Sequence, residues 1–188
     1  MRIATIGTAV IVAFLVGLPI ARGEPFIIDS RLADSYHFVD TYEIVIDRPP
    51  ADVWPYLVDQ ATWLNAEIAH ESGPHDAEGE ILRLYPGQDF FVEIVKLIPE
   101  RMFALANLPS NIDGEESVGI AMLTLTDLGG QTLVSSFMAR HYYWTGDGPN
   151  PLRERRASEE FQEFNRAAWE DELLPRLREL VEASPAQD

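Results

Sequence analysis

The stretch Glu43-Ile44-Val45-Ile46-Asp47-Arg48-Pro49-Pro50-Ala51-Asp52-Val53-Trp54 decides the fold of this chain. It ends a strand that we expect over residues 37–47, where apolar and polar residues alternate as in a strand with one buried face. The buried side holds Phe38, Tyr42, Ile44 and Ile46, with Asp40 among them, and the opposite side holds Thr41, Glu43 and Asp47. The prolines stop the strand, and Pro50 suits the first turn of a helix because the missing N–H would have no partner there. Residues 50–58 and 61–64 are therefore expected to form two short helices.

After these helices, apolar residues recur with period two in six runs. The breaks between the runs are rich in Gly, Pro, Asn and Asp, as in the turns of an antiparallel meander. The predicted strands are 65–71, 80–85, 90–98, 102–108, 118–127 and 132–144. Residues 152–181 then show the helical spacing of apolar residues, which places Phe161, Phe164, Ala168, Leu173, Leu177, Leu180 and Val181 near one inner face. Pro175 is expected to kink or split this helix.

Composition excludes several classes of function. The 188 residues include 14 Lys plus Arg and 31 Asp plus Glu, a net charge of −17. Nucleic acids and anionic membrane surfaces require a cationic footprint, so neither is an expected partner. The chain has no cysteine, which excludes disulfides, a thiolate nucleophile and Cys-ligated metal sites.

The first 23 residues have the organisation of a signal peptide. Arg2 precedes an apolar core over residues 3–20, and Ala21 and Gly23 stand at the positions that a signal peptidase reads. We expect cleavage before Glu24 and export to the periplasm or outside the cell, without stable membrane insertion of the mature chain. An uncleaved anchor is the alternative, because about 18 apolar residues are the lower limit for a membrane span. The expected organisation is a signal peptide (1–23), a lead-in segment (24–36), one domain (37–183) and a tail (184–188).

The opening stretch, continued by Leu57, Asp59 and Trp63, resembles the START and birch-pollen-allergen-like superfamily (SRPBCC), in particular its bacterial polyketide cyclase/dehydrase-like branch. The resemblance extends through residues 164–181 and covers residues 38–181. It implies an α+β helix-grip fold, in which a curved seven-stranded antiparallel sheet wraps around a long C-terminal helix. It also implies an elongated apolar cavity between sheet and helix.

Large apolar side chains on the strands and the helix are candidates for the wall of such a cavity. The candidates are Phe91, Phe103, Met122, Phe137, Tyr143 and Trp169. Each of them also suits an ordinary core, since buried aromatic residues usually serve packing. Trp54 and Trp63 are expected to join the short helices to the sheet.

Candidates for catalysis are weak. If residues 133, 135, 137, 139, 141 and 143 share the inner face, His141 and Tyr143 stand together at the end of the wall as a possible acid/base pair. The alternative is a hydrogen-bonded pair at the rim of the sheet. Arg83 and Arg140 could each hold a ligand carboxylate, but surface ion pairs are the more common use of arginine.

No metal site and no cofactor are expected. His70 and His75 flank a Gly-Pro turn beside Asp76, but they lack the i, i+4 spacing of helical ligands, and no third ligand follows at a familiar spacing. The leading hypothesis is an exported protein that binds a small lipid-like or aromatic molecule. The alternatives are a polyketide cyclase/dehydratase-like enzyme that uses the same cavity, and a non-catalytic interaction module, which as a homodimer would bury the apolar outer face of the sheet.

Overall fold

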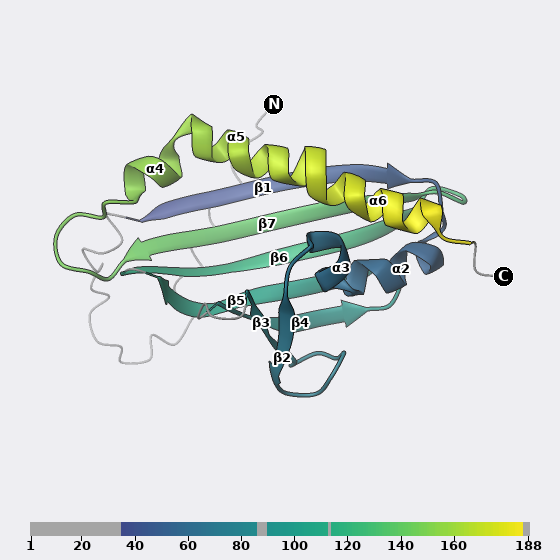
Figure 1. Cartoon of the computed structure of the whole chain (residues 1–188), viewed down its shortest axis with the longest axis horizontal. Helices are drawn as coiled ribbons and strands as arrows, with labels where there is room; N and C mark the ends of the chain where they lie inside the picture. The colour runs from purple at the N-terminus through teal and green to yellow at the C-terminus, as the bar shows by residue number, and fades with distance from the viewer. Residues whose placement is uncertain (1–34, 86–89, 113, 186–188) are drawn as a thin grey trace, which may run out of the picture.

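The computed structural model describes residues 35–85, 90–112 and 114–185 (Figure 1). Its seven strands form one antiparallel sheet in the order β1-β7-β6-β5-β4-β3-β2. The strands are β1 (Tyr36–Ile46), β2 (Ile68–Ser72), β3 (Ile81–Leu84), β4 (Phe91–Ile98), β5 (Met102–Ile112), β6 (Glu115–Asp127) and β7 (Thr132–Trp144). The predicted α+β helix-grip architecture, with a curved sheet and a C-terminal helical segment lying along it, is confirmed.

Two strands, β5 and β6, extend at least three residues beyond their predicted bounds. β5 runs on to Ile112 although Pro109 cannot donate a backbone hydrogen bond. A register shift between Asn107 and Ser110 accommodates it, because the residues of a β-bulge need no partner in the ladder. β6 accordingly begins at Glu115, three residues before the predicted start.

The two short helices close one end of the sheet. They are α2 (Pro50–Val58), with Pro50 in its first turn as expected, and α3 (Gln60–Leu64). Trp63 is fully buried, and its indole N–H donates to the carbonyl oxygen of Leu57 at 3.2 Å. The side chain of Trp63 thereby ties α3 to α2.

The C-terminal segment is helical in four pieces. They are α4 (Arg153–Ala157), α5 (Glu159–Ala167), the π-helical turn η2 (Ala168–Leu173) and α6 (Leu174–Ala183). The expected disturbance at Pro175 takes the form of η2, which ends two residues before the proline. The wider π turn accommodates a residue that has no N–H and would clash with the preceding turn of an α-helix.

The face that this segment buries differs from the prediction at one position. Leu174, Leu177 and Val181 are buried against the sheet and the short helices. Phe164, which the helical spacing placed on the inner face, is 69% exposed. The break at Ser158 and the π turn change the phase of the helix, so a single 3.6-residue period does not describe the whole segment.

The predicted signal peptide, nearly all of the lead-in segment and the last three residues of the tail lie outside the described residues. None of the helices in the described part of the chain has both the length and the apolar character that a membrane span requires.

Candidate functional site

A cavity of about 340 Å³ lies between the inner face of the sheet, α3 and the C-terminal helical segment. Its volume falls within the range of roughly 300–1,000 Å³ that small-molecule sites occupy. The sheet contributes Phe38, Leu84, Val92, Leu105, Asn107, Ala121, Leu123, Met138, Arg140 and Tyr142, and the helices contribute Gln60, Trp63, Leu64, Phe161, Asn165, Trp169 and Leu173. Tyr85 and Phe90 complete the lining. Most of these side chains are apolar, so the bulk of a ligand bound here would be apolar too.

Three residues in one row across the sheet shape the polar end of the cavity. Asn107 of β5 pairs with Gly119 of β6, and Gly119 pairs with Arg140 of β7. A Cβ atom built on Gly119 would lie 2.8 Å from Cγ of Arg140. The stem of Arg140 therefore uses the space that a side chain at position 119 would fill, which is one reason for a glycine inside a strand.

Arg140 brings a positive charge into this apolar lining. Its Nη1 lies 3.4 Å from the hydroxyl of Tyr142, and its guanidinium carbon lies 5.8 Å from the ring centre of Phe90. In the part of the chain that the structure describes, no carboxylate pairs with Arg140, and the lining contains no Asp, Glu or His. Among the described lining residues, the cavity thus offers an anionic group a guanidinium without a carboxylate partner, and it offers no set of metal ligands.

Two amides add hydrogen-bonding capacity to the cavity. Asn107 is 8% exposed, and its Nδ2 has no partner among the described residues. Gln60 is buried in the same way with an unpaired Oε1. An unsatisfied buried polar atom costs about 1–3 kcal/mol, so a ligand that bonds to either amide recovers part of that free energy.

Trp169 forms the helical wall of the cavity and is held by two other aromatic residues. Its ring stacks on Tyr42 at 5.7 Å between centroids and meets Trp63 edge-on at 6.0 Å. The hydroxyl of Tyr42 donates to Asp40 at 2.8 Å, and burial together with that carboxylate raises the pKa of Tyr42 far above its ordinary value. Tyr42 therefore remains neutral and serves to position Trp169.

An ion pair braces the cavity on the side of α4. Nε and Nη2 of Arg156 donate to one oxygen of the buried Glu115 carboxylate at 3.1 and 2.6 Å. The same guanidinium lies over the rings of Tyr142 and Phe161, at 4.4 and 4.9 Å from their centroids. Both rings line the cavity, so Arg156 fixes the position of two wall residues.

The structure places the six candidate wall residues in three different locations. Trp169 lines the cavity. Phe103 lies on the inner face but is buried in the core beside the cavity. The remaining four, Phe91, Met122, Phe137 and Tyr143, alternate with lining residues and so lie on the outer face of the sheet.

The error has one physical origin. In β7 the buried residues are the even-numbered ones, from Thr132 to Tyr142, whereas the prediction turned the odd-numbered ones inward. The odd-numbered set contains more apolar residues, since the even-numbered set includes Thr132, Ser136 and Arg140, and a shift of one residue exchanges the two faces of a strand completely. The sequence pattern of β7 therefore identified a strand without identifying its inner side.

The candidate acid/base pair consequently does not reach the cavity. His141 faces outward, where its Nδ1 lies 3.0 Å from Nδ1 of His37 on β1 and its ring lies 5.7 Å from that of Tyr143. Burial and the neighbouring His37 lower the pKa of His141. The polar contact that His141 makes is therefore with His37 of the neighbouring strand, on the outer face of the sheet. On the same outer face, the apolar side chains of Val39 and Ile120 are exposed. A homodimer that buries this face stays a prediction.

The two arginine candidates, Arg83 and Arg140, lie on opposite faces of the sheet. Arg83 forms an ion pair with Glu71 at 2.9 Å on the outer face, which is the expected surface role. Arg140 is the one that enters the cavity. The lining residues Asn107, Gln60 and Tyr142, together with Gly119, were missed. Gly119, in the interior of a predicted strand, was the available signal, because such a glycine often marks close approach to a ligand or another side chain.

Comparisons with known proteins identify the fold. No family model matches the sequence, and no curated protein matches it. Among solved structures, norcoclaurine synthase from Thalictrum flavum in complex with dopamine and hydroxybenzaldehyde is 14% identical with a TM-score of 0.55, covering 89% of this chain and 98% of that chain. The ZhuI aromatase/cyclase from Streptomyces sp. R1128 is 18% identical with a TM-score of 0.55, covering 78% and 94%. Ara h 8.0201 is 12% identical with a TM-score of 0.54, covering 79% and 100%. These likenesses, together with the sheet order and the C-terminal helical segment, show that this chain has the helix-grip fold.

Proposed function

We propose that this protein binds a small, mainly aromatic or lipid-like molecule that carries one anionic or strongly hydrogen-bond-accepting group. The observation that carries the proposal is Arg140, a guanidinium without a carboxylate partner among the described residues, in a cavity whose other lining is mostly apolar. The ring system or chain of the ligand lies between Trp169 and the sheet. Its acceptor group meets Arg140 and the Nδ2 of Asn107.

The overall negative charge of the chain opposes the binding of an anionic ligand. With a net charge of −17, the surface as a whole repels anions. An anionic group is stabilised inside only because the low dielectric of the cavity strengthens its attraction to a nearby guanidinium. A charge-assisted hydrogen bond of this kind is worth about 1.5–3 kcal/mol, or roughly a 10- to 150-fold change in Kd.

The solved structures support the aromatic part of this proposal. Norcoclaurine synthase is described in complex with dopamine and hydroxybenzaldehyde, two small aromatic molecules, and another match is an aromatase/cyclase. Both share the fold alone with this chain.

A catalytic role is the second candidate. His141 and Tyr143 cannot transfer protons to a ligand in the cavity, because they lie on the outer face of the sheet. The contact between Arg140 and the Tyr142 hydroxyl keeps this role open, because a guanidinium and a phenol beside a bound carbonyl would stabilise an enolate as in a cyclisation or a dehydration. We take binding as the primary function, because it needs only the groups that the cavity presents.

Export remains part of the proposal. It rests on the basic start, the apolar core and the small residues at 21 and 23. Intact mass measurement of protein from the periplasm or the medium should give a chain that begins at Glu24, and a chain that retains Met1 would argue for the anchor.

Native mass spectrometry of the protein, purified without detergent, should show an added mass that is released on denaturation. Binding of the fluorescent aromatic anion anilinonaphthalene sulfonate should then weaken by about 10-fold or more in Arg140→Met. Methionine keeps an apolar stem and removes the charge. Arg83→Met removes an equivalent charge from the outer face and should leave the Kd unchanged. Equal affinities of wild type and Arg140→Met would refute the assigned role of Arg140.

A further inference from the structure

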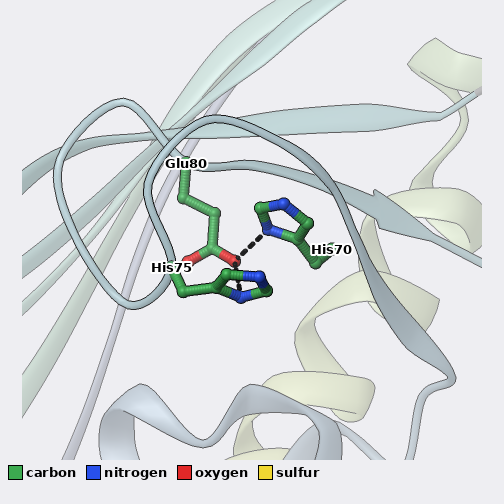
Figure 2. Close-up of side chains that lie close together, drawn as sticks. All are labelled: His70, His75 and Glu80. Carbon is green, nitrogen blue, oxygen red and sulfur yellow. Dashed lines mark hydrogen bonds and ion pairs between the residues drawn. The ribbon is translucent and has the colours of Figure 1, made fainter.

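His70, His75 and Glu80 converge at the hairpin formed by β2 and β3, away from the cavity (Figure 2). His70 belongs to β2, Glu80 directly precedes β3, and His75 lies in the loop between them. One donor atom from each of the three side chains lies within 4.8 Å of the others. The fold thus supplies the third ligand that the sequence spacing did not reveal.

The distances suit a small transition-metal ion. Nδ1 of His70 lies 2.9 Å and Nδ1 of His75 lies 3.8 Å from the same carboxylate oxygen, Oε1 of Glu80. A tetrahedral Zn²⁺ with bonds of about 2.0–2.1 Å separates its ligand atoms by about 3.3 Å. That separation falls between these two observed values, and each of them differs from it by about half an ångström.

Glu80 is a buried carboxylate that lacks a strong cationic partner. Its side chain is only 5% exposed. Its Oε2 accepts the backbone N–H of Asp76 at 2.6 Å, which leaves Oε1 to the two imidazoles. Among the described residues, no Lys or Arg forms an ion pair with it. A buried carboxylate facing two imidazole nitrogens is the donor set of a metal site with two histidines and one carboxylate.

The loop brings these groups together. Gly73 has φ +86°, and a Cβ built there would lie 2.3 Å from the carbonyl oxygen of Gly79, so the two ends of the loop are in direct contact. The two imidazole rings are stacked at 3.7 Å between centroids. The side chain of His75 is 72% exposed and can turn so that its lone pair points at the ion.

We propose that His70, His75 and Glu80 bind one divalent transition-metal ion of the Zn²⁺ type, with solvent in the fourth position. Imidazole nitrogens select such ions over Mg²⁺ and Ca²⁺, which prefer all-oxygen sites. The bound ion cross-links the two strands of the β2–β3 hairpin. Leu84, at the far end of β3, lines the cavity, so the ion also stabilises one edge of the cavity wall.

Isothermal titration of the untagged protein with zinc chloride tests this proposal. The expected result is one Zn²⁺ per chain with a Kd of about 1 µM or tighter. His75→Gln, a change at an exposed side chain, should weaken the Kd by at least about 10-fold. The matched control, His37→Gln, removes a histidine from the outer face of β1 and should bind Zn²⁺ as wild type does.

Thermal unfolding gives a second readout. Zn²⁺ should raise the Tm of wild type and of His37→Gln, and EDTA should reverse the rise, because an ion that binds only the folded state stabilises it. His75→Gln should show a much smaller rise at the same Zn²⁺ concentration. The proposal is overturned if wild type does not bind Zn²⁺, or if His75→Gln and wild type bind it equally. Because the probe is the metal alone, either result is independent of ligand binding in the cavity.

Discussion

Ala121→Leu distinguishes a ligand cavity from an ordinary packing defect. Ala121 lies on β6 between Leu105 of β5 and Met138 of β7, and all three line the cavity. Leucine adds three carbon atoms to the middle of the sheet wall, where space is available. A site that serves a ligand should lose affinity when it is filled in this way, although the fold itself gains apolar contacts.

The magnitude follows from the area removed from water. Three buried carbons at about 0.8 kcal/mol each give an upper value of about 2.4 kcal/mol. Because the added atoms are only partly enclosed, we expect the free energy of unfolding to rise by about 1–2 kcal/mol. The Kd for anilinonaphthalene sulfonate should rise by about 10-fold or more, since the leucine occupies part of the volume that the ring system needs.

Urea unfolding followed by tryptophan fluorescence measures the first quantity, and fluorescence titration with the sulfonate measures the second. Ala139→Leu is the matched control, because Ala139 lies on the outer face of the neighbouring strand β7. It should leave the Kd unchanged. A drop of about 1–3 kcal/mol in stability, as overpacking produces, combined with unaltered affinity for Ala121→Leu, would refute the existence of the cavity as a binding site.

Three further predictions concern stability. Arg156→Met should lower the free energy of unfolding by about 3 kcal/mol, because it leaves the buried Glu115 carboxylate without its partner. Leu177→Ala should lower it by about 2–5 kcal/mol, because Leu177 is fully buried where α6 meets the core. Stability should fall as the pH drops below about 6.5, because a histidine with a lowered pKa, His141, binds fewer protons in the folded state than in the unfolded state. His141→Gln should make that fall shallower.

Urea midpoints at constant temperature measure all three. The double variant Arg156→Met with Glu115→Gln should recover part of the loss, and no recovery would contradict the assignment of the loss to an unpaired carboxylate. An unchanged midpoint in Leu177→Ala would mean that α6 does not contribute to the cooperative core. Parallel pH profiles for wild type and His141→Gln would exclude His141 as a source of the acid sensitivity.

The local patterns of the sequence were sufficient for the order of the helices and strands. Seven runs of period-two alternation, two short helical segments after a proline turn and a C-terminal helical pattern correspond to the observed element order. These signals depend on neighbouring residues only, since turn residues end strands and the hydrophobic period reports the local secondary structure. In β1 the facing was also correct, because Thr41 and Glu43 are polar where Tyr42 and Ile44 are apolar, which leaves only one side suitable for burial.

The candidate site required the tertiary structure. In β7 both faces carry apolar residues, so which face is buried depends on the elements that cover it, here α3 and the C-terminal helical segment. Arg140 reaches the cavity because its face of β7 is the inner one, and because Gly119 on the neighbouring strand β6 leaves space for its side chain. The grouping of Glu80 with two histidines likewise depends on how the β2–β3 hairpin closes. Sequence determined the elements because their signals are local; only the packing of distant segments decided which side chains meet, because burial and proximity are properties of the folded chain as a whole.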